Sequence, residues 1–251
     1  GACVAATVGG CQTQFGYLWG HPAPRQKVLR PFALPRPERP QWIPMTLHAE
    51  PTAPHLTLDD LTSRLQQAGV LTPAVLDALD LAQQVHGQQQ RDDGTPYLEE
   101  HIYPVMHDVC AWALGSAGAQ VATAVTIAAL HDTLEDGDGL EWQDLAQRFG
   151  PEVGAAVRSL TKPPKTGTDA ASKLERERTY FAGLRQGPRL AQVVKLFDRV
   201  NNLSCLHKTS AEKRSGYLEE TREYHLPLAE SLDPALAGRM RALVERLAAM
   251  P

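Results

Sequence analysis

The segment from residue 121 to residue 136 constrains this chain most, because an apolar run leads directly into a group of charged side chains. Val121 to Leu130 contains no charged residue, and a helix that is apolar all round is expected at the centre of a domain. His131-Asp132 lies within the same expected helix, about residues 119–134, and Glu135-Asp136 follows at its end. On a helix, side chains four residues apart share a face, so His131 would lie over Glu135 and Asp132 over Asp136.

This crowding of carboxylates favours a metal site. Burying several negative charges without a cation is very costly, and a divalent metal supplies the missing positive charge. The alternative is an ordinary acidic helix end that faces solvent. The long apolar run before His131 favours the internal position.

Composition excludes several classes of function. The net charge of −4 argues against a nucleic-acid binder, which usually carries a basic face. No apolar run approaches the roughly 18–20 residues that a membrane span needs. Cys110 and Cys205 lie in helical patterns and are expected to be small buried residues, which suits a reducing cytoplasm. The sequence gives no indication of the oligomeric state.

The chain divides into two parts that differ in composition and in hydrophobic periodicity. Residues 1–50 are rich in Gly and Pro without a sustained period, so we expect a disordered or non-native extension and assign it no function. Residues 55–250 have the 3.6-residue period of helices and no convincing strand, so we expect a single all-α helical bundle. Thr57 and Thr72-Pro73 are typical helix starts. Helices are expected over about 58–68, 73–90, a segment reaching 114, 119–134, 141–149, 151–160, 172–186, 188–206, 210–232 and 234–249.

Candidate metal ligands come from three of these helices. Hard divalent cations accept imidazole and carboxylate ligands, and His131 with Asp132 supplies two of them. Asp198, on another largely apolar helix, is a good third ligand. Either His101 or His107 is the fourth, and neither has a distinguishing local pattern.

Four segments carry a resemblance to a known family. They are His86 to Arg91 with Gly94 to Tyr97, Ala128 to Asp136, Val194 to Leu203, and Glu220-Thr221 with Tyr224 and Pro227 to Ala229. Together they resemble the HD-domain phosphohydrolase superfamily, and within it the hydrolase domain of the RelA/SpoT homologues and their small stand-alone alarmone hydrolases. The sequence departs from that pattern at several places. The spacing from Tyr97 to His101 is longer by one residue, no Pro follows His101, and Asp92 stands where many members have a basic residue. The glycine of the opening motif is displaced to Gly87, and Cys205 replaces a frequent Thr.

The resemblance implies a role for each matching residue. It implies one Mn²⁺ held by His101, His131, Asp132 and Asp198. It implies that Glu135 and Asp136 activate or position the attacking water. It implies a guanine nucleotide whose base packs on Arg91 and which Asn202 and Tyr224 hold, with Lys162 near the substrate.

The activity implied by this family is hydrolysis of guanosine 3′,5′-bis(diphosphate), or its 5′-triphosphate analogue, to GDP or GTP and pyrophosphate. Two alternatives stay open: an HD-family phosphohydrolase that acts on another nucleotide or phosphate ester, and a non-catalytic nucleotide sensor. Retention of all four acidic positions, Asp132, Glu135, Asp136 and Asp198, speaks against the sensor. The expected partner is therefore a small-molecule guanine nucleotide, without nucleic acid or membrane, in the cytoplasm.

Overall fold

The computed structural model describes residues 55–116, 120–165 and 167–250, and these residues form helices without a strand. The elements are α1 (Leu58–Gln67), α2 (Pro73–His86), η1 (Leu98–Ile102), α3 (Tyr103–Gly115), α4 (Val121–Leu130), α5 (Thr133–Asp136), α6 (Trp142–Phe149), α7 (Pro151–Leu160), α8 (Ala170–Gln186), α9 (Arg189–Cys205), η2 (Leu206–Lys208), α10 (Ala211–Glu220), η3 (Thr221–His225), α11 (Leu226–Leu232) and α12 (Pro234–Ala248). The all-α prediction is confirmed for this part of the chain. The extension expected over residues 1–50 lies outside the described residues.

Two helix starts follow directly from capping chemistry. The Thr57 hydroxyl accepts a hydrogen bond from the Asp60 amide at 3.1 Å, and the Thr72 hydroxyl accepts one from the Val75 amide at 3.3 Å. Each bond satisfies one of the amide groups that the first turn of a helix leaves without a partner. Both predicted starts are confirmed.

The helix expected over residues 119–134 is instead two helices separated by a bend at His131 and Asp132. The His131 ring bonds the Ala128 carbonyl at 2.8 Å, and the Thr133 hydroxyl donates to the Leu130 carbonyl at 2.7 Å. Side chains thus satisfy carbonyls that a continuing helix would have bonded through its backbone, which ends α4 at Leu130. The helix expected to reach residue 90 likewise ends earlier, at His86.

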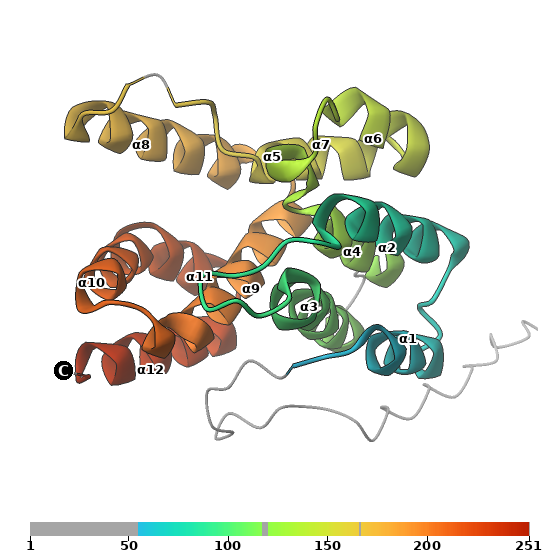
Figure 1. Ribbon diagram of the computed structural model, residues 1–251, viewed down its shortest axis with the longest axis horizontal. Helices are drawn as coiled ribbons and strands as arrows, with labels where there is room; N and C mark the ends of the chain where they lie inside the picture. Colours follow the sequence, from blue (N-terminus) through green and yellow to red (C-terminus); the bar gives the residue numbers. More distant parts are fainter. Residues whose placement is uncertain (1–54, 117–119, 166, 251) are drawn as a thin grey trace, which may run out of the picture. The chain divides into compact units, whose positions relative to one another are not determined.

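Helix α4 is the centre of the described fold (Figure 1). It packs against α2, α3, α7 and α9, and its residues from Ala124 to Leu130 are all buried. Helix α9 contacts α3, α4 and α7 as well as α11 and α12, so it joins the two ends of the helical array. The C-terminal end of α4, the start of α3 and the middle of α9 therefore meet at one place inside the protein.

We find no helix among the described residues with the length and apolar character that crossing a membrane requires.

Candidate metal centre and substrate pocket

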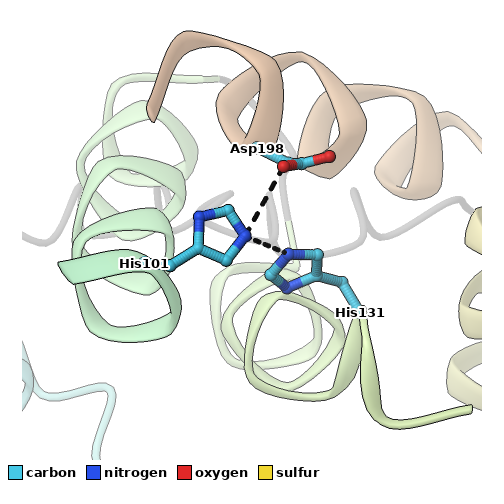
Figure 2. A group of neighbouring side chains, drawn as sticks. All are labelled: His101, His131 and Asp198. Atoms are coloured by element: carbon cyan, nitrogen blue, oxygen red, sulfur yellow. Dashed lines mark hydrogen bonds and ion pairs between the residues drawn. The ribbon is translucent and has the colours of Figure 1, made fainter. Parts of the chain in front are cut away.

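His101, His131 and Asp198 lie together at the meeting point of η1, α4 and α9 (Figure 2). One potential ligand atom from each of the three lies within 4.8 Å of the others, and all three residues are buried. The Nε2 atom of His101 lies 3.2 Å from Nε2 of His131 and 3.5 Å from Oδ1 of Asp198. Asp132 joins them, since its Oδ2 lies 3.4 Å from His101 Nε2 and 3.2 Å from His131 Nε2. The structure thus brings the four predicted ligands together.

A π-turn over Leu98–Ile102 places His101 in this cluster. The Tyr103 amide bonds the Leu98 carbonyl, five residues back, and α3 continues directly from that turn. A π-turn holds about one residue more than an α-helical turn, so it takes up the extra residue between Tyr97 and His101. His107 lies elsewhere, with its Nε2 atom 3.2 Å from the Arg64 guanidinium. His101, not His107, is therefore the histidine of the cluster.

Hydrogen bonds on the far side of each ring fix the orientation of both imidazoles. Nδ1 of His101 lies 2.7 Å from the Asn201 amide oxygen, and Nδ1 of His131 lies 2.8 Å from the Ala128 carbonyl. Both of these oxygens only accept, so in each neutral ring Nδ1 carries the proton and Nε2 presents a lone pair. Two lone pairs then face each other at 3.2 Å, an arrangement that a bound cation satisfies.

A backbone carbonyl holds the Asn201 side chain in the orientation that faces its amide oxygen to His101. Its Nδ2 donates to the Glu100 carbonyl at 3.1 Å, which leaves Oδ1 to face His101. In an α-helix the Glu100 carbonyl would accept from residue 104, and Pro104 has no N–H. The side-chain amide of Asn201 therefore supplies a donor that the helix itself lacks.

The electrostatics of the cluster favour positive charge. Burial lowers the pKa of His131, but the Asp132 carboxylate outweighs burial and raises that pKa to about 9. Burial raises the pKa of Asp198, yet Lys195, with Nζ 2.8 Å from Oδ2, and then His101 hold it below its usual range. Both carboxylates of the cluster are thus anionic at neutral pH, and either protons or a metal must balance them.

A pocket of about 640 Å³ opens onto this cluster. Its lining residues include six carboxylates and five lysine or arginine side chains, together with His101, Tyr97 and Asn202. The carboxylates are Asp92, Asp93, Asp132, Glu135, Asp136 and Asp198, and the cations are Arg91, Lys162, Lys195, Lys208 and Lys213. A phosphorylated ligand would be repelled by this surplus of acids, whereas a divalent cation would reverse the balance. The donor set and the charge both fit such an ion.

The acidic pair of α5 lies at the surface of the pocket. Glu135 is exposed, and its Oε1 accepts a hydrogen bond from the Lys162 backbone amide at 2.8 Å. Asp136 accepts a bond from Gln89 Nε2 at 3.1 Å, and Gln89 Oε1 lies 2.6 Å from Nδ1 of the fully buried His86. A chain of hydrogen bonds from His86 through Gln89 thus orients the Asp136 carboxylate.

Helix α9 presents several pocket residues on one face. Lys195, Asp198, Asn202 and Cys205 all line the pocket, at intervals of three or four residues that keep them on one side of a helix. Asn202 Nδ2 donates to Asp198 Oδ1 at 2.5 Å, and Arg91 donates to the Asn202 amide oxygen at 3.0 Å. Arg91 and Asn202 therefore lie next to each other beside the metal cluster, as the substrate assignment requires.

Tyr224 is the predicted site residue that the structure does not bring to the pocket. Its ring stacks on Phe181, with centroids 4.4 Å apart and an interplanar angle of 3°. Tyr217, seven residues earlier, does line the pocket. Tyr217 in turn packs on the Arg199 guanidinium, 4.8 Å from the ring centroid.

Three residues that hydrogen-bond to the cluster or to the acidic pair had no role assigned from sequence: Asn201, Gln89 and Tyr97. The Tyr97 hydroxyl donates to Asp132 Oδ2, and burial together with that carboxylate raises the pKa of Tyr97 far above its usual range. Asn201 lies three residues after Asp198, so helical spacing from the expected ligand was the available signal. Gln89 and Tyr97 lie between helices, where no periodicity marks them.

A sequence model of the HD domain matches residues 78–234 of this chain. The chain belongs to the HD-domain family. Members of this family hold a divalent metal, and the His/Asp cluster supplies the donors for one.

Relatives with curated names share this part of the chain. The guanosine-3′,5′-bis(diphosphate) 3′-pyrophosphohydrolase of Aquifex aeolicus is 32% identical over 174 residues, which cover 69% of this chain and 24% of that protein. The GTP pyrophosphokinase rsh of Brucella ovis is 35% identical over 150 residues, 59% of this chain and 19% of that protein. The chain thus spans about a quarter or less of the length of these relatives.

The fold itself has a solved counterpart. A structure described as "A metazoan ortholog of SpoT hydrolyzes ppGpp and plays a role in starvation responses" superimposes with a TM-score of 0.59 at 22% identity. The match covers 71% of this chain and 98% of that one. The HD-domain architecture of the described helices therefore agrees with an independent structure.

Proposed function

We propose that this HD-domain protein is a Mn²⁺-dependent hydrolase that removes pyrophosphate from the 3′ position of guanosine 3′,5′-bis(diphosphate) or its 5′-triphosphate analogue. The observation that carries the proposal is the convergence of His101, His131, Asp132 and Asp198 beside a pocket that also holds the Glu135-Asp136 pair and several cations. A relative in Aquifex aeolicus that is named for this reaction supports the choice of substrate. We also infer that residues 55–250 act as one phosphohydrolase domain.

The four residues of the cluster would hold the metal. Two imidazole nitrogens and two carboxylates suit Mn²⁺, which accepts mixed nitrogen and oxygen ligands. When bound, such an ion lowers the pKa of a coordinated water and polarises a phosphoryl oxygen. Tyr97 and Asn202 hold Asp132 and Asp198 in place through hydrogen bonds to their carboxylates.

The reaction is the hydrolysis of one phosphorus–oxygen bond by one water molecule. The water oxygen attacks the phosphorus attached to the ribose O3′, the P–O3′ bond breaks, and its electron pair goes to O3′. One proton of the water is taken up by the acidic pair and a proton is delivered to O3′, which gives a nucleotide with a free 3′ hydroxyl and pyrophosphate. Glu135 and Asp136 suit the first proton transfer, because both carboxylates face the pocket and Gln89 orients one of them.

The lysines at this end of the pocket neutralise the diphosphate. Burial lowers the pKa of Lys195, but Asp198 and then Tyr180 outweigh burial and hold it well above its usual range, so Lys195 stays cationic. Lys162 lies near the same ring, with its Nζ 5.7 Å from the Tyr180 centroid that Lys195 also approaches at 5.7 Å. Two cations thus flank the region next to the metal ligands.

Arg91 and Asn202 would hold the nucleoside. The Arg91 guanidinium is fixed by bonds of 3.3 and 3.0 Å to the amide oxygens of Asn201 and Asn202, which presents a flat cationic face to a base. A cytoplasmic location is part of the proposal. It rests on Cys110 and Cys205, both buried as free thiols.

A second candidate is another nucleotide or phosphate ester as the substrate of the same metal centre. The position of Tyr224, stacked on Phe181 and outside the pocket lining, favours this alternative, because one of the expected nucleotide contacts is missing. The chemistry at the metal would be the same, and only the leaving group would differ.

The test is pyrophosphate release from guanosine 3′,5′-bis(diphosphate) with Mn²⁺ and with EDTA, alongside metal analysis of the protein. Asp132→Ala is the matched control, since it removes one ligand and leaves the nucleotide contacts in place. Metal-dependent release that Asp132→Ala abolishes supports the proposal. Bound metal without release points to the second candidate, and the absence of both metal and release contradicts the proposal as a whole.

A further inference from the structure

Two ion pairs join two separate segments of the chain that line the same pocket, away from the metal ligands. Asp93 Oδ2 lies 2.8 Å from Lys208 Nζ, and Asp92 pairs with Lys213. All four residues line the pocket. The acids belong to the turn that follows Arg91, and the lysines belong to η2 and the first turn of α10. We call these four residues the rim.

The contacts on α9 place the rim beyond the nucleoside site. From the metal ligand Asp198 they run to Asn202, then to Arg91, whose neighbour in the chain is Asp92. Asp198 and Cys205 both line the pocket and are separated by seven residues of helix, or about 10 Å. Lys208 follows through η2. The pocket therefore has a metal end, a middle at Arg91, and the rim.

The Asp92–Lys213 ion pair of the rim is poorly suited to a purely structural role. The side chains of Asp92 and Lys213 are 75% and 43% exposed. Pairs with this exposure contribute at most about 1 kcal/mol, because water screens the charges and two long side chains must be ordered. A phosphate group carries more charge than one carboxylate and offers more acceptor oxygens, so it competes well for a lysine.

Both acids can release their lysines at little cost. Asp92 faces water, and Asp93 keeps other partners, since its Oδ1 accepts from the Thr95 hydroxyl at 2.6 Å and from the Thr95 amide at 3.2 Å. These bonds, with Lys208, hold the pKa of Asp93 far below its usual range. Neither carboxylate is left without a hydrogen-bond partner when its lysine turns to a ligand.

We infer that Lys208 and Lys213 form a second phosphate subsite, which binds the 5′ phosphate chain of a nucleotide phosphorylated at both ends. Asp92 and Asp93 occupy these lysines until that chain displaces them. The inference rests on the proposed function and deepens it, because it makes the pocket selective for nucleotides with phosphates at both the 3′ and the 5′ positions. A nucleotide that lacks the 5′ phosphates leaves the ion pairs in place.

If these ion pairs only anchor a loop, Asp92→Asn should change KM in the direction opposite to the one that competition with phosphate predicts. If Asp92 only anchors the turn that carries Arg91, Asp92→Asn loosens that turn and weakens substrate binding. If Asp92 competes with phosphate, Asp92→Asn frees Lys213 and strengthens binding of the substrate with 5′ phosphates. The sign of the change in KM therefore separates the two roles.

The experiment compares guanosine 3′,5′-bis(diphosphate) with guanosine 3′-diphosphate as substrates of wild type, Asp92→Asn and the double variant Lys208→Met/Lys213→Met. We expect Asp92→Asn to lower KM for the bis(diphosphate) by about threefold. We expect the double variant to reduce the selectivity for the bis(diphosphate), taken as the ratio of the two kcat/KM values, by about tenfold or more. Lys165→Met/Lys173→Met, which changes two exposed lysines outside the pocket lining, is the control matched to the double variant in net charge.

Failure of the inference and failure of the proposed function give different results. If wild type hydrolyses the bis(diphosphate) but Asp92→Asn raises its KM, or the double variant changes both substrates equally, the second subsite is wrong while the hydrolase stands. If wild type hydrolyses neither compound, the proposed function is wrong. The subsite is then decided by calorimetric binding of the bis(diphosphate) in EDTA, where an equal Kd for wild type and double variant overturns it.

Discussion

Asn201 allows a sharp test of how the metal site is built. Its Oδ1 accepts from His101 Nδ1 at 2.7 Å, and its Nδ2 donates to the Glu100 carbonyl at 3.1 Å. Asn201→Leu removes both bonds, and also the 3.3 Å bond from Arg91 to Oδ1, with little change in side-chain volume. Asn201→Asp also loses the donor to Glu100, but its carboxylate still accepts from His101. The two variants therefore differ in whether His101 and Arg91 keep an acceptor at position 201, and only the His101 ring reaches the metal cluster.

The magnitudes follow from these two bonds. Losing the partner of a metal-ligating histidine weakens metal binding about 10- to 100-fold, so Asn201→Leu should bind Mn²⁺ that much more weakly than wild type. Asn201→Asp should bind at least as tightly as wild type, since a carboxylate raises the basicity of the ring. Both variants leave the Glu100 carbonyl without its donor, which costs about 1–3 kcal/mol of unfolding free energy in each.

The assays are calorimetric titration with Mn²⁺ and thermal unfolding in EDTA. Similar losses of Tm in the two metal-free variants, with very different Mn²⁺ affinities, would support the assignment. Equal Mn²⁺ affinities in Asn201→Leu and Asn201→Asp would refute it, because His101 would then not depend on Asn201 for its tautomer.

Three further perturbations test other parts of the structure. Gln89→Leu breaks the link from His86 to Asp136, and we expect kcat to fall about tenfold with KM nearly unchanged in steady-state kinetics; a rise in KM alone would contradict a positioning role. Burial holds the pKa of His225 well below its usual range, so the unfolded chain takes up a proton near pH 6.5 that the folded protein refuses. The contribution of His225 to the unfolding free energy is therefore fully present above about pH 6.5. It falls on acidification by up to about 1.4 kcal/mol per pH unit. Urea unfolding at pH 7 and 5.5 should show a smaller loss of stability in His225→Gln than in wild type. Gly154→Ala would place a Cβ 2.6 Å from the Ala146 Cβ and 2.8 Å from its backbone, which forces α6 and α7 apart. We expect Tm to fall by several degrees in calorimetry. An unchanged Tm would mean that these helices separate freely.

Helices and most residues of the His/Asp cluster were predictable, because each rests on a local pattern. Thr57 and Thr72 mark helix starts by capping chemistry, and the apolar run before His131 predicted a buried helix that ends at the site. The split of that helix was not predictable in the same way. It depends on the His131 ring and the Thr133 hydroxyl taking two backbone carbonyls, a choice that only the packed structure decides.

Two π-turns account for the other differences. The choice between His101 and His107 depended on the turn over Leu98–Ile102, which takes up one residue without disturbing α3. Tyr217 and Tyr224 are seven residues apart and would share the face of a continuous α-helix, but η3 (Thr221–His225) changes the winding between them. Tyr217 therefore reaches the pocket and Tyr224 packs on Phe181. A single π-turn has no periodic pattern of its own, so a single sequence gives no warning of it.

The rotation of helix α9 about its own axis decides which of its side chains reach the pocket. Lys195, Asp198, Asn202 and Cys205 reach the pocket from one face, while Leu196, Val200 and Leu203 seat the helix in the core. A shift of one residue in that seating would turn the face by about 100° and withdraw Lys195, Asp198 and Asn202 from the pocket together. Substitutions in the buried seat of α9 should therefore act pleiotropically on metal affinity and substrate affinity. Under the proposed function, mutations in α5, which carries the acidic pair alone, should instead affect turnover separately. Helix α9 would then evolve as one unit, and α5 could change independently of it.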